Sequence, residues 1–180
     1  MMFIIFPIIT FLYLKGGVEF RKQSFAEMKN LGKVDRDKLT KSDTISFYQK
    51  VLVLLNGNFQ NDKERTKVKK LLDQFQNRQD LAFIHLTNDS TLIDDKATDN
   101  DYICYIPGFD GDYQTVLDSG KLVLSTNEIA LADTTGKILN KYSIDNIEQM
   151  KKFVIHTALT IPAVEKKEAR FRNQIENEQN

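Results

Sequence analysis

Val51-Leu52-Val53-Leu54-Leu55 is a run of five apolar residues with no polar residue among them. An uninterrupted apolar run of this kind is typical of a strand in the middle of a sheet, covered on both faces. A second, almost entirely apolar run reads LAFIHL at residues 81–86. We expect these two runs to form the central strands of the fold.

The segment between the two runs has the pattern of an amphipathic helix. Asn61 is placed to cap its N-terminus, with Glu64 three residues later. Four apolar residues then form one face of the helix at positions i, i+3, i+4 and i+7: Val68, Leu71, Leu72 and Phe75. The helix is expected to end near Asn77. A strand, a helix and a strand in this order predict a βαβ unit with parallel strands.

The second half of the chain predicts a hairpin and a closing helix. Residues 128–133 and 137–142 flank Thr134-Thr135-Gly136, a connection that suits an antiparallel hairpin. Asp145 and Glu148 then start a helix that Pro162 ends. The expected buried face of that helix is Ile147, Met150, Val154, Ala158 and Ile161. The order βαβ then ββα predicts an α/β, thioredoxin-like three-layer fold with helices on both faces of the sheet.

The middle of the chain is less patterned. Residues 87–101 are expected to form a solvated acidic loop, because their carboxylates lack the spacing and the turn glycine of a calcium loop. Residues 102–106 alternate like a strand that Pro107-Gly108 ends. Residues 110–119 are expected to hold one or two helical turns, with three apolar side chains facing inward: Tyr113, Val116 and Leu117.

Residues 1–14 read MMFIIFPIITFLYL and carry no charge. As a helix they cover only about 21 Å of the roughly 30 Å hydrocarbon core, so a span must borrow the following glycines while Lys15 snorkels. We expect an uncleaved transmembrane anchor. A cleaved signal peptide is the alternative, but it expects basic residues before the apolar run, and here they follow it. The predicted organisation is an anchor at 1–17, a stalk and linker or edge strand at 18–46, a thioredoxin-like domain at 47–162 and a charged tail, helical or disordered, at 163–180.

Composition excludes some classes of function. The chain has 25 Lys and Arg against 25 Asp and Glu, interspersed, so it lacks the basic stripe that binding to a phosphate backbone requires. No nucleic acid is therefore expected as a partner. The single cysteine, Cys104, excludes an intrachain disulfide and a zinc site built from cysteines.

Several stretches, in this order, resemble the Sco/SenC family. In chain order they are the tether motif Phe20-Arg21-Lys22, the strand Val51 to Leu55, Tyr105-Ile106-Pro107-Gly108, residues 129–138 (IALADTTGKI) and residues 146–156 (NIEQMKKFVIH). The resemblance implies a thioredoxin-like domain anchored in the bacterial inner membrane and associated with cytochrome oxidase assembly. It also implies a periplasmic domain, whereas the basic residues after the apolar run favour the cytoplasm by the positive-inside rule.

The residues that carry copper and thiol chemistry in that family are missing. The family has a Cys-x-x-x-Cys pair at the start of its first helix and a histidine before the closing hairpin. Here residues 58–65 contain no cysteine, and Leu124-Ser125-Thr126 contains no histidine. Amide and hydroxyl groups do not replace the thiolates that select Cu(I). We therefore expect no catalytic, cofactor or metal site, and a non-catalytic accessory role beside a respiratory membrane complex and the lipid bilayer.

Two other readings stay open. One is a copper chaperone or thiol oxidoreductase that uses Cys104, although a free cysteine in a strand usually packs as a small hydrophobe. A site combining Cys104 with His85 and His156 would draw on three separate elements. The other reading is a small-ligand or peptide-binding module, which would show a pocket beside residues 58–61. Asn58→Ala is expected to leave stability nearly unchanged.

Overall fold

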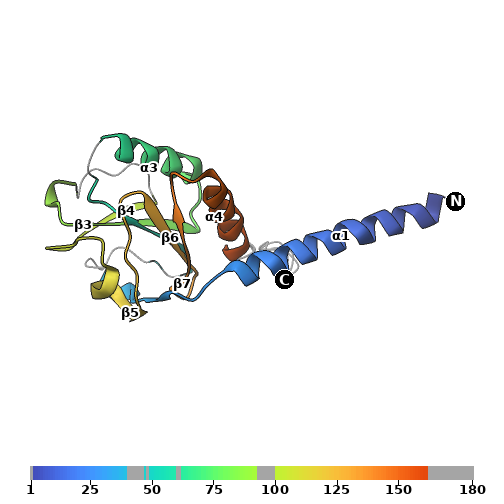
Figure 1. Ribbon diagram of the computed structural model, residues 1–180, viewed down its shortest axis with the longest axis horizontal. Helices are drawn as coiled ribbons and strands as arrows, with labels where there is room; N and C mark the ends of the chain where they lie inside the picture. The colour runs from blue at the N-terminus through green and yellow to red at the C-terminus, as the bar shows by residue number, and fades with distance from the viewer. Residues whose placement is uncertain (1, 40–46, 48, 60–61, 93–99, 162–180) are drawn as a thin grey trace, which may run out of the picture.

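The computed structural model describes residues 2–39, 47, 49–59, 62–92 and 100–161, with residues 2–14 described only in the course of their backbone. Figure 1 shows one sheet with α3 and α4 packed together on it and α1 extending away from the domain. The elements in chain order are α1 (Met2–Glu27), β1 (Gly32–Val34), α2 (Arg36–Leu39), β2 (Val51–Asn56), α3 (Asp62–Phe75), β3 (Leu81–Thr87), η1 (Ser90–Leu92), β4 (Asp101–Tyr105), η2 (Tyr113–Val116), β5 (Leu117–Gly120), β6 (Glu128–Ala132), β7 (Lys137–Ser143) and α4 (Ile147–Thr160).

The seven strands form one mixed sheet in the order β4-β3-β2-β6-β7-β1-β5. β2 pairs in parallel with β3, which pairs in parallel with β4. On its other side β2 pairs antiparallel with β6, and β6 forms the hairpin with β7. The predicted βαβ unit, the strand that follows it and the hairpin are confirmed, and the fold is mixed α/β.

Helices α3 and α4 cover one face of the sheet. Val51, Val53 and Leu55 of β2 point to this face and are at most 1% exposed. α3 covers them with the predicted apolar residues Val68, Leu71 and Leu72, and Phe75 is partly buried beside them. From α4, Phe153 packs edge-on against Phe75 and Tyr142, with ring centroids 6.0 Å and 5.4 Å apart.

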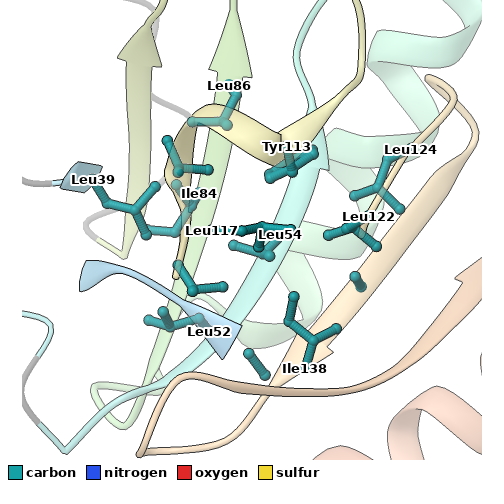
Figure 2. Packing of buried hydrophobic residues seen from close by; sticks show 14 of the residues in the cluster. Leu39, Leu52, Leu54, Ile84, Leu86, Tyr113, Leu117, Leu122, Leu124 and Ile138 are labelled. Atoms are coloured by element: carbon teal, nitrogen blue, oxygen red, sulfur yellow. The ribbon is translucent and has the colours of Figure 1, made fainter. Parts of the chain in front are cut away.

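The opposite face is covered without a long helix. Leu52 and Leu54 lie there beneath Tyr113, Leu122 and Leu124, as Figure 2 shows. Among the described residues, the cover consists of the four-residue α2, the 3-10 turn η2 and irregular chain. The prediction of helices on both faces is therefore wrong for this part of the chain, whereas the predicted inward residues are confirmed as buried: Tyr113, Val116 and Leu117.

Two short strands extend the sheet beyond the hairpin. β1, from the segment expected to be a linker or an edge strand, lies between β7 and β5. β5 occupies positions expected to be helical turns. Gly32 faces Gly120 across this pair, and a Cβ on Gly32 would lie 2.2 Å from the Ser119 carbonyl oxygen. Gly32 also has φ +133°, a backbone conformation that other residues rarely adopt. For both reasons, only glycine fits at this position.

The buried face of α4 differs from the predicted one. Phe153, His156 and Thr157 are buried, whereas Ile147 is 73% and Val154 45% exposed. Ala158 is exposed, and Met150 and Ile161 are partly buried. The N-cap is Asn146 in place of Asp145, and its side chain accepts from the backbone N–H groups of the second and third helical residues. The expected helix cap Asn61, the stop at Pro162 and the tail at 163–180 lie outside the described residues.

Helix α1 runs without a break to Glu27, past the point where the stalk was expected to begin. Glu27 pairs with Lys152 of α4 at 2.8 Å, and the following chain joins the sheet through a hydrogen bond from the Leu31 N–H to the Ile138 carbonyl at 3.0 Å. Val18, Phe20 and Phe25 are each 51% exposed. Within the parts of the chain that are described, we find no helix with the length and apolar character to cross a bilayer. The anchor at 1–17 stays a prediction.

The burial of β2 on both faces predicts that Leu54→Asp unfolds the domain. Leu54 is 0% exposed between Ile84 of β3 and Ala130 of β6, so an aspartate there would be a buried charge without a partner. We expect a loss of about 3 kcal/mol or more in the free energy of unfolding. Val123→Asp is the matched control, because Val123 is 48% exposed. Equal denaturant midpoints for the two variants would contradict the central position of β2.

Candidate functional site

The loop after β2 lies at the carboxyl end of the parallel strands. In open α/β sheets, ligands bind in the crevice outside these strand ends. Gly57 follows β2 directly, and its N–H donates to the Leu86 carbonyl of β3 at 2.8 Å. This loop is also where the Sco/SenC resemblance implies a cysteine pair. Its side chains therefore decide what chemistry remains.

Asn56, the last residue of β2, is a buried structural amide. It is 5% exposed, and its Nδ2 donates to the Leu124 carbonyl at 2.8 Å. Its Oδ1 accepts from the Asn58 N–H at 3.0 Å, which fixes the start of the loop. A Cβ on Gly111 would lie 2.9 Å from this Nδ2 and 2.5 Å from the Leu124 carbonyl oxygen. Asn56 therefore holds the loop to the chain that crosses the other face of the sheet.

Asn58 makes three hydrogen bonds with its side chain. Its Nδ2 donates to the Phe109 carbonyl at 2.7 Å. Its Oδ1 accepts from the Thr87 hydroxyl and from the Asn88 N–H, both at 2.9 Å. These three bonds argue against the expectation that Asn58 is dispensable for stability. Sequence alone gave no signal for this role, since the partners lie 29 to 51 positions further along the chain.

A histidine and an aspartate meet on the helix-covered face beside the loop. His85 Nε2 of β3 lies 2.9 Å from Asp101 Oδ1 at the start of β4, and the two side chains are 7% and 3% exposed. The contact meets the distance of an ion pair but not the angles of a hydrogen bond, so Nε2 has no hydrogen bond among the described residues. Asp101 was expected in a solvated acidic loop, and its burial overturns that expectation. The neighbouring residues 93–99 lie outside the described part.

Two hollows adjoin the loop. The first has a volume of about 250 Å³ and lies between α3 and the strands β3 and β4, with Gly57 and Phe59 on the loop side. The second has a volume of about 380 Å³ and is more polar, lined by residues that include Asn58, Asp62 and Asp89. The hypothesis of a ligand-binding module predicted a pocket beside residues 58–61. Of these, Asn58 and Phe59 are described; Phe59 lines both hollows and Asn58 lines the second.

The other candidate residues lie apart. Ile103 faces His85 in the sheet register, so the next residue, Cys104, lies on the opposite face. Its Sγ donates to the Leu39 carbonyl at 3.3 Å. His156 lies on α4, where its Nδ1 is 2.7 Å from the Tyr142 hydroxyl. Burial lowers the pKa of His156 and raises the pKa of Tyr142 well above its ordinary value.

Cys104, His85 and His156 therefore form no common site. Within the described part of the chain, no group of three or more His, Cys, Asp or Glu is placed to hold a metal ion.

Comparisons with known proteins find structural neighbours only. No family model matches the sequence, and no curated protein matches it. A provisionally assigned protein disulfide isomerase from Bacteroides thetaiotaomicron is 17% identical, with 64% of this chain and 76% of that chain covered and a TM-score of 0.44. A SCO1/SenC family lipoprotein from Bacillus anthracis str. Ames is 16% identical, with coverages of 73% and 92% and a TM-score of 0.40. BsSco, a member of the Sco family of cytochrome c oxidase assembly proteins, is 12% identical, with coverages of 74% and 91% and a TM-score of 0.39. Similarity at this level transfers no activity or ligand to this chain.

The bonds of Asn58 predict that Asn58→Ala destabilises the domain. Removing a partly buried amide with three hydrogen bonds is expected to lower the free energy of unfolding by about 1–3 kcal/mol. Asn77→Ala is the control, since Asn77 lies in the exposed turn after α3. Chemical denaturation followed by circular dichroism measures both. An Asn58→Ala variant as stable as the control would show that the loop is held by other contacts.

The position of Cys104 predicts slow alkylation in the folded protein. Its thiol donates to a carbonyl and packs, partly buried, against the apolar residues on the face of the sheet opposite α3 and α4. We expect native labelling by iodoacetamide to be at least about tenfold slower than labelling in denaturant, since reaction needs an exposed thiolate. Equal rates in the two conditions would reopen the thiol reading.

Proposed function

We propose that this chain is a membrane-tethered, non-catalytic thioredoxin-like protein that acts as an accessory partner of a cytochrome oxidase-related respiratory complex. The observation that supports it most is the loop after β2. Where thiol chemistry would need a reactive sulfur, Asn56 and Asn58 are committed to holding backbone carbonyl and N–H groups. An amide in such bonds is neither a nucleophile nor a soft metal ligand.

The location in this proposal derives from the sequence. The apolar run at 1–14, the tether motif Phe20-Arg21-Lys22 and the resemblance to the Sco/SenC family together favour the bacterial inner membrane, with the domain on the periplasmic side. The shape of the molecule is compatible with a tether, since α1 extends away from the sheet (Figure 1). Near its C-terminal end, α1 contacts the domain through the ion pair of Glu27 with Lys152 of α4.

A groove between α3 and α4 is the surface we assign to the partner. It has a volume of about 680 Å³, and its apolar lining includes Ile147 and Val154, the two large apolar side chains of α4 that are exposed. Three lysines line it: Lys67, Lys70 and Lys151. Lys67 pairs with Asp145 and Lys151 with Glu148, so the charge at the rim is largely balanced and the apolar lining is the feature that a partner can use. An exposed apolar groove between two helices suits the apolar side of an amphipathic segment, so this is the chemistry proposed for the contacting part of the complex.

Loss of the tether is expected to abolish the association. A chain that starts at Val18 lacks the apolar run, so it loses the raised effective concentration that a membrane anchor gives at a membrane partner. We expect oxidase subunits, identified by mass spectrometry after affinity purification in detergent, to be lost from this variant. They should remain with a Gln60→Ala/Asn61→Ala variant. An anchor-free chain that retains the oxidase subunits would overturn the tethered role.

The groove can be tested separately from the tether. Ile147→Asp/Val154→Asp places two carboxylates on an exposed apolar surface, so folding is expected to persist while recovery of oxidase subunits falls at least about tenfold. Val123→Asp changes an apolar residue of similar exposure outside the groove and serves as the control. Unchanged recovery with the double variant would assign the partner to another surface.

The alternative, a copper chaperone or thiol oxidoreductase acting through Cys104, is separated by titration with Cu(I). The accessory role predicts no stoichiometric binding of Cu(I). Cys104 is the single cysteine of the sequence, and its thiol already donates to the Leu39 carbonyl. Binding of one Cu(I) per chain that Cys104→Ser abolishes would replace the proposal with the alternative.

A further inference from the structure

The hollow between α3 and the β3–β4 strands has three chemically different zones. Its lining joins α3, the loop after β2 and the strands, and its volume is about 250 Å³. This is below the roughly 300–1,000 Å³ of sites for drug-sized ligands, so it suits a molecule of one ring and short substituents.

The buried end is polar. His85 and Asp101 line it, and each side chain is more than nine-tenths buried. His85 Nε2 lacks a hydrogen bond in the described structure, although it lies 2.9 Å from the Asp101 carboxylate. Buried polar atoms are nearly always bonded, so each exception requires an explanation, and at the end of a hollow a hydrogen-bonding molecule can supply the partner. A neutral hydroxyl fits this end, because it can accept from Nε2–H while an anion would be repelled by Asp101.

The walls are apolar and the rim is basic. Val68 and Leu72 of α3 are buried, and Ile103 and Phe59 complete the lining around them. The Phe59 ring lies edge-on to His85 with centroids 6.2 Å apart, an arrangement that a further aromatic ring can extend. Arg65 and Lys69 lie on the exposed side of α3 and line the same hollow. The charge of Arg65 also acts on the Asp89 carboxyl, so Lys69 is the cation that most favours an anionic group at the mouth.

We propose that this hollow binds a small aromatic acid that carries a hydroxyl group opposite its carboxylate. The ring lies between Val68, Leu72 and Ile103. The hydroxyl meets His85 and Asp101, and the carboxylate lies near Arg65 and Lys69. This function is separate from the association with a membrane complex, since the hollow lies on the side of α3 away from the α3–α4 groove.

Isothermal titration of the full chain with three related compounds tests the proposal. 4-Hydroxyphenylacetate has all three features, phenylacetate lacks the hydroxyl and 2-(4-hydroxyphenyl)ethanol lacks the carboxylate. We expect saturable one-to-one binding of the first compound. The other two should bind about fivefold more weakly, because phenylacetate loses one hydrogen bond at the buried end and 2-(4-hydroxyphenyl)ethanol loses one ionic contact at the rim. No saturable binding of any compound, or equal affinity for all three, would overturn the proposal.

Variants assign the two ends of the ligand. Lys69→Ala is expected to weaken 4-hydroxyphenylacetate several-fold and to leave 2-(4-hydroxyphenyl)ethanol unaffected, while Lys63→Ala, on the same helix but outside the lining, changes neither. His85→Phe is expected to weaken the hydroxylated acid and to leave phenylacetate unaffected. If His85→Phe fails to fold, the Lys69 and Lys63 variants decide the outcome. Equal effects of these two lysine variants would overturn the placement of the carboxylate.

Discussion

Strand β2 is buried on both faces, and its two hydrogen-bonded neighbours run in opposite directions. β3 lies parallel to it and β6 antiparallel. All of its side chains are buried, alternately beneath the helices and beneath η2 and the loops. Because a one-residue slip would exchange the two sets of side chains, the register of β2 fixes both cores at once. The positions of the loop, the hollow and α3 follow from that register.

The elements with a local pattern could be predicted from the sequence. The apolar runs of β2 and β3 and the stripe of α3 carry their period within a few residues, and the β6–β7 hairpin has a turn glycine. β1 has three residues and β5 four, too few for a pattern, and their pairing depends on the Gly32–Gly120 approach. On α4, the polar His156 and Thr157 lie inward with Phe153, so hydrophobicity alone selected the wrong face.

The candidate site was harder to predict because its residues are joined only in space. The sequence shows that the loop after β2 contains no cysteine, but the bonds of Asn58 depend on Phe109 and Thr87, which the folded chain brings to it. Asp101 comes directly after a stretch rich in aspartate, so the sequence alone does not separate it from the exposed acidic residues expected there. Its burial follows from the parallel pairing of β4 with β3, which sets Asp101 opposite Phe83 on the face beneath α3.

The hollow follows from the same arrangement of layers. α3 lies over β2 and β3, where Val68, Leu71 and Leu72 meet Val53 and Phe83. β4 adds one more strand at the edge of the sheet, beyond the buried stripe of the helix. The space between that stripe and β4 is lined by the polar side chains of His85 and Asp101 as well as by Ile103. Where β4 extends the sheet beyond the buried stripe of α3, a polar-ended hollow therefore remains beside the loop after β2, and the described side chains that line it include no sulfur.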